Sequence, residues 1–135
     1  MIFDMPPESH FNGTSLAYLG DAVLELITRQ YLLTCGVTDV GKLNHMALEY
    51  VRATAQSEAV ERILPFLDEE ETAVFKRGRN SHGISIPKSA SASQYRRATG
   101  LEALFAHLYI NGKSERMKEL YLIGFKPVEN CCDAK

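Results

Sequence analysis

The sequence predicts an all-α protein that folds as one domain. Its 135 residues, of which 45% are hydrophobic, are enough to bury a core. Apolar residues recur at i, i+3 and i+4 along most of the chain, and the short stretch "GISIP" is the nearest approach to a strand. We therefore expect a single helical domain over residues 1–135, with residues 1–13 as an N-terminal extension and 124–135 as a C-terminal tail.

The first helix is expected to begin at Thr14 or Ser15, because either side chain can cap a helix N-terminus. Gly36 is a suitable C-terminal stop. Leu24 lies outside the apolar stripe of this helix, which predicts that a second surface covers it. The stripe itself consists of Leu16, Leu19, Val23, Leu26 and Ile27.

The second helix is predicted from Gly41 to Leu64, because Pro65 lies just beyond its end. Its periodicity predicts one continuous element. The apolar positions that define it are Leu43, Met46, Ala47, Tyr50, Val51 and Ala55.

The third helix is predicted to start at Asp68, since Glu71 three residues later completes a capping-box pattern. It should run to about Arg77. Gly78 is the expected stop.

A long polar segment follows, and two helices complete the chain. Residues 80–94, "NSHGISIPKSASASQ", contain five serines and read as a loop. A structureless loop of this length is uncommon in a compact domain and is often functional. Further helices are expected over 95–110 and 114–123.

The chain gives no sign of secretion or of a membrane span. The N-terminus has no basic segment followed by an apolar one, and no apolar run approaches the roughly 20 residues that cross a bilayer. The three cysteines form no CxxC pair and suggest no disulfide framework. We expect a reduced, cytoplasmic protein.

Two acidic residues stand in helices where acids are costly. Gly20-Asp21 interrupts the otherwise apolar "SLAYLGDAVLEL", and Glu102 is the one acid in "TGLEALFAHLYI", which is apolar on nearly every side. A buried carboxylate must be paired, protonated or bound to a metal. Two carboxylates on two helices make a magnesium site, while a solvated Asp21 and a Glu102 paired with Arg96 or Arg97 are the structural alternatives.

The charge distribution points to a polyanion. The segment from Lys76 to Arg97 has six basic residues and no acidic one, although the whole chain has a net charge of −2. Such a segment suits a phosphate backbone. The alternative is that the charges keep a loop solvated. The basic residues are Lys76, Arg77, Arg79, Lys88, Arg96 and Arg97.

The two acidic helices resemble the motifs of the ribonuclease III family. "LAYLGDAVLEL" is similar to its signature helix, and "GLEALFAHLYI" is similar to its second acidic motif, in the same order. The likeness covers Thr14 to Phe125. It leaves no room for a double-stranded-RNA-binding domain after Glu115, so the chain resembles the short form of the family, Mini-ribonuclease III.

This resemblance implies a magnesium-dependent endoribonuclease that cuts double-stranded RNA and matures 23S ribosomal RNA precursors. Asp21 and Glu102 would be the catalytic metal ligands, and the six basic residues would bind the RNA. Gly20 would let another backbone, or the helix of a partner subunit, approach closely. The implied assembly is a helical homodimer, with a ribosomal protein that presents the RNA as a further candidate partner.

Two positions depart from the pattern of full-length members. Those members carry an acid four residues before the first aspartate, where this chain has Ala17, and another three residues before the glutamate, where it has Thr99. The short form commonly lacks both. The departures leave open the number of bound metal ions, and they favour one rival, a catalytically weak or inactive RNA- or ribosome-binding module. A helical hydrolase of small phosphate compounds is the other rival, and the six basic residues argue against it.

Overall fold

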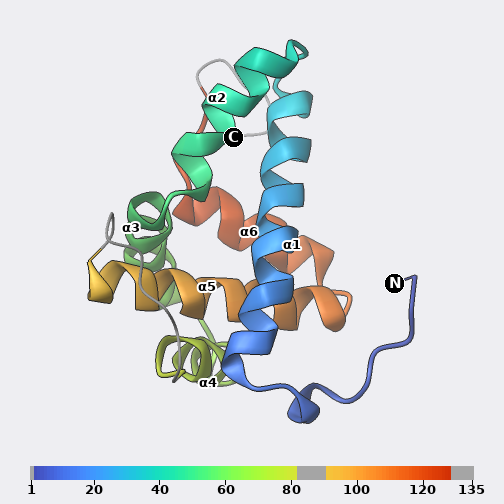
Figure 1. Cartoon of the computed structure of the whole chain (residues 1–135), viewed down its shortest axis with the longest axis vertical. Helices are drawn as coiled ribbons and strands as arrows, with labels where there is room; N and C mark the ends of the chain where they lie inside the picture. Colours follow the sequence, from blue (N-terminus) through green and yellow to red (C-terminus); the bar gives the residue numbers. More distant parts are fainter. Residues whose placement is uncertain (1, 82–90, 129–135) are drawn as a thin grey trace.

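The computed structural model describes residues 2–81 and 91–128, and this part of the chain is built from helices without any strand (Figure 1). No helix within it is long and apolar enough to cross a membrane. The elements in chain order are the 3-10 turn η1 (Glu8–His10), α1 (Gly13–Thr34), α2 (Val40–Val51), α3 (Ala53–Ile63), the 3-10 turn η2 (Leu64–Phe66), α4 (Glu69–Arg79), α5 (Ala92–Ile110) and α6 (Ser114–Gly124).

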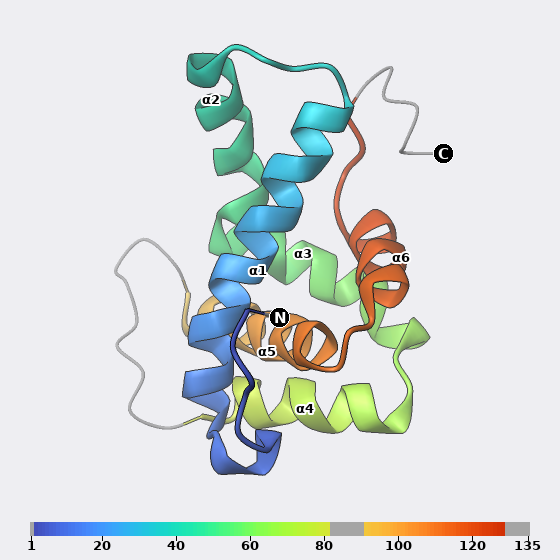
Figure 2. The same cartoon turned by 90° about the vertical axis from the view of Figure 1, so that its right-hand side faces the viewer.

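Helix α5 forms the centre of the molecule. It packs against α1, α3, α4 and α6, which surround it in both views (Figures 1 and 2). From Ala98 to Leu108 every residue of α5 is buried except Glu102, which is half-buried. The prediction of a buried helix around Glu102 is therefore confirmed.

Helix α1 starts one residue before the predicted caps. The cap is Asn12, whose side-chain oxygen accepts a hydrogen bond from the backbone N–H of Ser15 at 2.8 Å. Gly13, the first residue of the helix, packs tightly on α4, where a Cβ would lie 2.5 Å from the carbonyl oxygen of Arg77. At the other end the predicted stop is confirmed, since Gly36 has φ +90°, a conformation that favours glycine.

Leu24 does not need a second subunit to cover it. Its side chain is only 2% exposed and belongs to the main core of its own chain. The prediction from the helical wheel was wrong because α1 is covered on more than one side, with α2, α4 and α5 all packing against it.

The predicted second helix is two helices. Arg52 has an extended backbone, with φ −67° and ψ 147°, and separates α2 from α3. No proline or glycine marks this break in the sequence. The reason lies in tertiary packing, because the change of direction places α3 against α5 and α6 and buries Ala59, Val60 and Ile63.

Gly78 is part of α4 and does not stop it. A Cβ at Gly78 would lie 2.7 Å from the Cβ of Ala103 and 2.9 Å from the Cα of Gly100, so this glycine permits the close crossing of α4 over α5. The capping box of Asp68 and Glu71 at the start of α4 is confirmed.

The helix after the polar segment starts earlier than predicted. Helix α5 begins at Ala92, three residues early, because Ser91 and Gln94 form a capping box at its N-terminus. Residues 82–90 lie outside the described part of the chain. Helix α6 begins at the expected Ser114 and ends one residue beyond the expected position.

Cys35 follows the last residue of α1 and is disulfide-bonded. The expectation that the cysteines are reduced is therefore wrong at this position. The two remaining cysteines, Cys131 and Cys132, lie outside the described residues.

Candidate active site

Helices α1 and α5 cross in direct contact at Gly20. A Cβ at this position would lie 1.6 Å from the carbonyl oxygen of Glu102 and 2.4 Å from its carbonyl carbon. No side chain larger than hydrogen fits there. The close neighbour of Gly20 is thus the backbone of its own chain, and this contact places the motif "GD" of α1 directly beside Glu102 on α5.

The crossing brings Asp21 and Glu102 to one open pocket of about 220 Å³. Asp21 is exposed, whereas Glu102 is half-buried. The pocket spans about two turns of each helix, because its lining residues recur at helical spacing. They are Thr14, Ala17, Tyr18 and Asp21 from α1, and Tyr95, Thr99 and Glu102 from α5.

The electrostatics of this pocket are those of two adjacent acids, with no basic side chain among the described residues that line it. Burial, together with the hydrogen bond and negative charge of the adjacent Asp21 carboxyl, raises the pKa of Glu102 to about 9. Arg97, an expected partner of Glu102, instead forms an ion pair with Glu61 at 2.9 Å, and Arg96 is exposed. In the described part of the chain no lysine or arginine forms an ion pair with Glu102.

The chemistry of these donors fits a hydrated magnesium ion. Magnesium takes one or two protein carboxylates and completes its shell with water and phosphate oxygens. The described residues that line the pocket include no third carboxylate: Ala17 has no polar group, and the Thr99 hydroxyl donates to the carbonyl of Tyr95 at 2.9 Å. Among the described residues no group of three or more His, Cys, Asp or Glu side chains could hold a metal ion.

The basic residues predicted to bind RNA differ in their surroundings. Lys76 and Arg96 are exposed and have no ion-pair partner within the described ranges. Arg97 is engaged by Glu61 and also lies 3.5 Å from the hydroxyl of Ser57. Two of these basic side chains are thus without an ion-pair partner among the described residues, and the third forms an ion pair within the fold.

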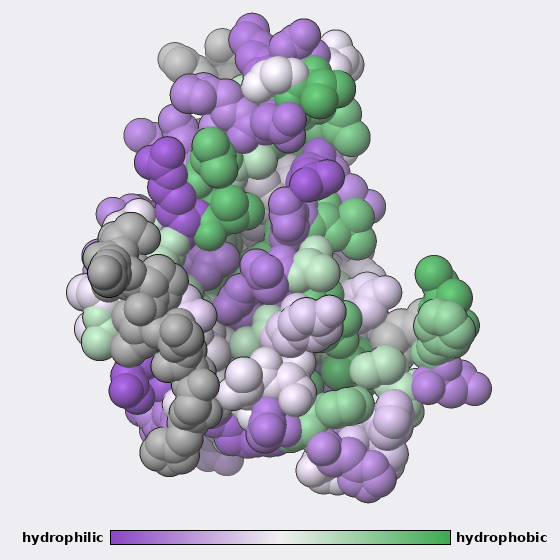
Figure 3. All heavy atoms as spheres, viewed as in Figure 1, coloured by the Kyte–Doolittle hydropathy of each residue, from purple (hydrophilic) through white to green (hydrophobic). Residues whose placement is uncertain are grey.

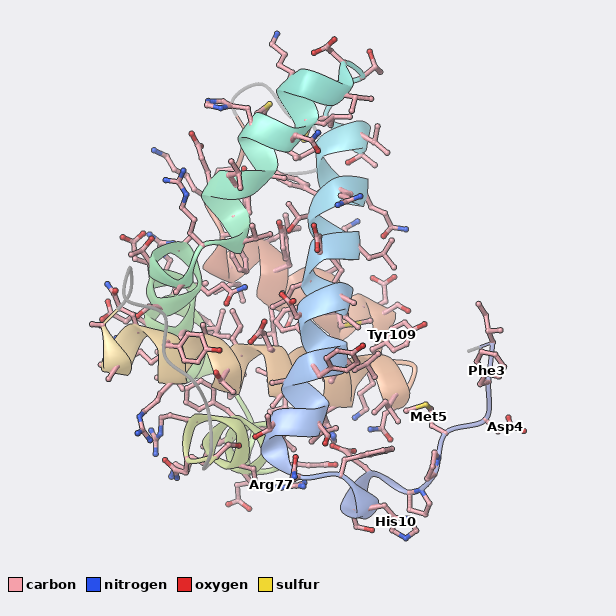
Figure 4. All side chains as sticks on the ribbon, in the orientation of Figure 1. Phe3, Asp4, Met5, His10, Arg77 and Tyr109 are labelled. Atoms are coloured by element: carbon pink, nitrogen blue, oxygen red, sulfur yellow. The ribbon has the colours of Figure 1, made fainter. Side chains whose placement is uncertain are left out.

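The remaining three are placed as follows. Arg77 donates a hydrogen bond to the carbonyl of Phe11 and lies beside the N-terminal segment (Figure 4). The Arg79 guanidinium lies 5.7 Å from the ring centre of Phe75 and hydrogen-bonds to Asn80. Lys88 lies outside the described residues.

Three residues that line the pocket were not predicted from the sequence, namely Thr14, Tyr18 and Tyr95. A usable signal was present for two of them. Thr14 lies seven residues before Asp21, and Tyr95 seven before Glu102, so each stands two helical turns away on the same face. Tyr18 lies three residues before Asp21, and its side chain is 86% exposed, which is unusual for a tyrosine.

Comparison with known proteins identifies the family. The model of the ribonuclease III domain matches residues 14–113. The chain is 45% identical to a Mini-ribonuclease 3 of Symbiobacterium thermophilum over 106 residues, which cover 78% of this chain and 82% of that one. It is 41% identical to a Mini-ribonuclease 3 of Enterococcus faecalis over 111 residues, covering 81% and 84% of the two chains.

A solved structure shares the fold. The crystal structure of a protein from Fusobacterium nucleatum superposes with a TM-score of 0.73 and 35% identity, over 82% of this chain and 88% of that one. The matched segments contain both helices that form the pocket. The chain therefore belongs to the ribonuclease III family, and it is an endoribonuclease.

Proposed function

We propose that this endoribonuclease cleaves double-stranded RNA in a magnesium-dependent reaction at the pocket between α1 and α5. The observation that carries the proposal is the pairing of Asp21 with Glu102, because a fold gains nothing in stability from two adjacent carboxylates without a cation. A phosphodiester substrate supplies further oxygen ligands to a magnesium ion that two carboxylates hold.

In this mechanism Asp21 and Glu102 would hold and orient the ion. Bound magnesium would supply Lewis-acid stabilisation of negative charge on the phosphate and a lowered pKa for the attacking water. Glu102 provides the fixed ligand, because its backbone is locked against Gly20. Asp21 provides the exposed ligand on the side that RNA can reach. Hydrolysis would leave a 5′ phosphate and a 3′ hydroxyl.

We propose that exposed basic residues next to the pocket hold the RNA backbone. Arg96 directly follows Tyr95, which lines the pocket, and Lys76 lies near the end of α4, which packs beside α5. Both side chains are exposed and without an ion-pair partner in the described part of the chain. Contacts of this kind position a duplex without reading its sequence, which suits an enzyme that recognises RNA by shape.

We propose a homodimer in which each protomer cuts one strand. The support from the fold is apolar surface along α1 that the single chain leaves open: Tyr18 is 86% exposed, Leu26 51% and Leu33 53%. These exposed residues, and not the buried Leu24, support a second subunit. Exposed apolar surface of this kind is typical of an interface.

The similarity to proteins named Mini-ribonuclease 3 supports a finer proposal. The substrate would be the precursor of 23S ribosomal RNA in the cytoplasm, presented by a ribosomal protein. The alternative is a weakly active or inactive RNA- or ribosome-binding module, which the absence of acids at Ala17 and Thr99 favours.

One experiment separates these functions. The protein is incubated with labelled double-stranded RNA and with labelled 23S precursor, each with and without magnesium. Cutting of the duplex only with magnesium supports the nuclease, and discrete cuts in the precursor support the rRNA substrate. Binding without cutting at saturating magnesium would establish the binding module instead.

A further inference from the structure

The N-terminal arm, residues Ile2–Met5, extends from a base that is anchored on α5. Glu8 in η1 lies 2.8 Å from the Nδ1 atom of the buried His107. The amide of Asn111 donates a second hydrogen bond to Glu8 at 3.3 Å. The position of the arm relative to the helices is therefore set by contacts at its base.

The tip of the arm carries apolar side chains that its own chain does not cover. Ile2 is 94% exposed and Phe3 is 80% exposed. In Figures 1 and 3 the tip stands clear of the helical body, and Figure 4 shows Phe3 directed away from it. Two large apolar residues in succession on a projecting segment contribute nothing to the stability of this chain. Their exposure indicates a contact with another molecule.

A groove between α1 and α6 has the complementary properties. It has a volume of about 460 Å³, and most of its lining surface is apolar. Leu26 on its wall is 51% exposed, so the groove is open to solvent. Its lining includes Ile27, Tyr109, Met117, Lys118, Tyr121 and Leu122.

The arm and the groove lie on the same face of the molecule. Tyr109, which lines the groove, and His107, which holds the base of the arm, both lie near the C-terminal end of α5. Figure 4 shows Tyr109 and Met5 on the same side of α1. A two-fold interface pairs the same surface of both protomers. When the arm and the groove share that surface, the arm of each protomer can enter the groove of the other at the same time.

We propose that the N-terminal arm of one protomer occupies the α1/α6 groove of a second copy, and that the two protomers exchange arms. Ile2 and Phe3 would contact the apolar wall. Asp4 follows them and would face Lys118, which lines the groove. This inference rests on the proposed homodimer and adds the segment that joins the two subunits.

A photo-crosslinking experiment on the full chain tests the exchange. Phe3 is replaced by p-benzoylphenylalanine in protein with normal isotopes, which is mixed with unmodified protein labelled with ¹⁵N before illumination. We expect crosslinks that join light and heavy chains through peptides containing Leu26 or Leu122. The matched control carries the same photoreactive residue at Phe66, which is 57% exposed in η2 and does not line the groove.

The outcomes are distinct. Crosslinks within single chains only would show that the arm folds onto its own groove, and crosslinks to other surfaces, or none above the Phe66 control, would equally overturn the exchange. Sedimentation and RNA cleavage of the same sample before illumination report separately on the dimer and the nuclease. A dimeric, active enzyme without the crosslink would contradict the exchange of arms but not the proposed dimer or the proposed nuclease.

A dissociation measurement adds a quantitative test. Phe3→Ser should raise the dimer Kd by at least about tenfold, the lower bound for losing a buried aromatic side chain. Phe66→Ser, also at an exposed phenylalanine, should leave the Kd unchanged. Equal Kd values for Phe3→Ser and the unaltered protein would contradict the proposal.

Discussion

Glu71 and Glu102 are two glutamates on helices that pack against each other, yet their surroundings are opposite. Glu71, 4% exposed, meets both Nε and Nη2 of Arg116 at 2.8 Å, and its pKa is lowered chiefly by these hydrogen bonds. Glu102 meets another carboxyl, Asp21, and its pKa is raised to about 9. The fold neutralises the first acid from within. No described cation neutralises the second, which is held protonated at neutral pH until a cation from outside binds, and such a perturbed pair is a candidate functional site.

The sharpest test of this contrast is to remove the negative charges one at a time. Asp21→Asn and Glu102→Gln should each reduce cleavage more than about hundredfold, because even an outer-shell partner of a metal site typically contributes 10–100-fold. Both variants should fold, since neither charge is paired with a cation in the described part of the chain. Cleavage of labelled duplex at saturating magnesium measures the effect.

Glu71→Gln is the matched control for these two variants. It changes a more deeply buried glutamate in the same way, so at a temperature where it is folded it should cleave at the normal rate. Near-normal cutting by Glu102→Gln, or loss of cutting by Glu71→Gln, would break the contrast.

Removing the cation from the other pair should affect stability. Arg116→Met leaves the Glu71 carboxylate buried and unpaired, which should lower the free energy of unfolding by about 3 kcal/mol. Arg29→Met is the control, because Arg29 pairs with Glu25 at 2.8 Å in a setting where both side chains are largely exposed. That loss should stay within about 0.5 kcal/mol. Urea unfolding of the two variants gives the comparison, and equal losses would contradict it.

The pH dependence of the Arg116→Met deficit follows from the sign of the Glu71 shift. A carboxyl whose pKa is lowered in the folded state contributes stability above its unfolded pKa of 4.5, and this contribution disappears as the pH falls through the folded value. The difference between Arg116→Met and the unaltered protein should therefore be largest near neutral pH and shrink below about pH 4.5. A deficit that does not change between pH 7 and 3 would assign the loss to packing.

Magnesium should stabilise the protein through the Asp21 and Glu102 pair alone. A ligand that binds only the folded state raises the free energy of unfolding by about 2.7 kcal/mol at a hundredfold excess over its Kd. Thermal unfolding with increasing magnesium should show this rise for the unaltered protein and for Glu71→Gln, and no rise for Glu102→Gln. A response that survives Glu102→Gln would move the metal elsewhere.

The smallest expected effect concerns two neighbouring arginines, of which only one has an ion-pair partner in the described part of the chain. Arg96 is exposed without an ion-pair partner in the described ranges, whereas Arg97 pairs with Glu61. Arg96→Ala should lower the salt slope of RNA binding by about one unit for every duplex sequence, and Arg97→Ala should lower it less. Binding titrations at several salt concentrations measure the slopes, and the reverse order would count against our assignment.

The sequence predicted what local chemistry decides. Helix periodicity, the capping box at Asp68 and the glycine stop at Gly36 all depend on neighbours in the chain, and all three appear in the structure. Two acids in two apolar helices were also visible as an anomaly, and the structure places both beside one pocket.

What the sequence could not predict depends on contacts between distant segments. The break at Arg52 has no local breaker and follows from the packing of α3 on α5. Gly78 looks like a helix stop until α5 is placed against it, and Leu24 looks uncovered until α1 is surrounded. That residues of α1 and α5 line one pocket likewise becomes visible only when the two helices cross.

Gly20 has no side chain, yet its packing at the helix crossing sets the distance between the carboxylates of Asp21 and Glu102. A methyl group there would meet the Glu102 carbonyl, so one helix would have to shift, and Asp21, the next residue, would shift with it. Both carboxylates would persist with their chemistry unaltered, at a separation that no longer matches one ion. The distance between the two carboxylates therefore depends on backbone packing at Gly20. Mutagenesis restricted to titratable side chains would miss this residue.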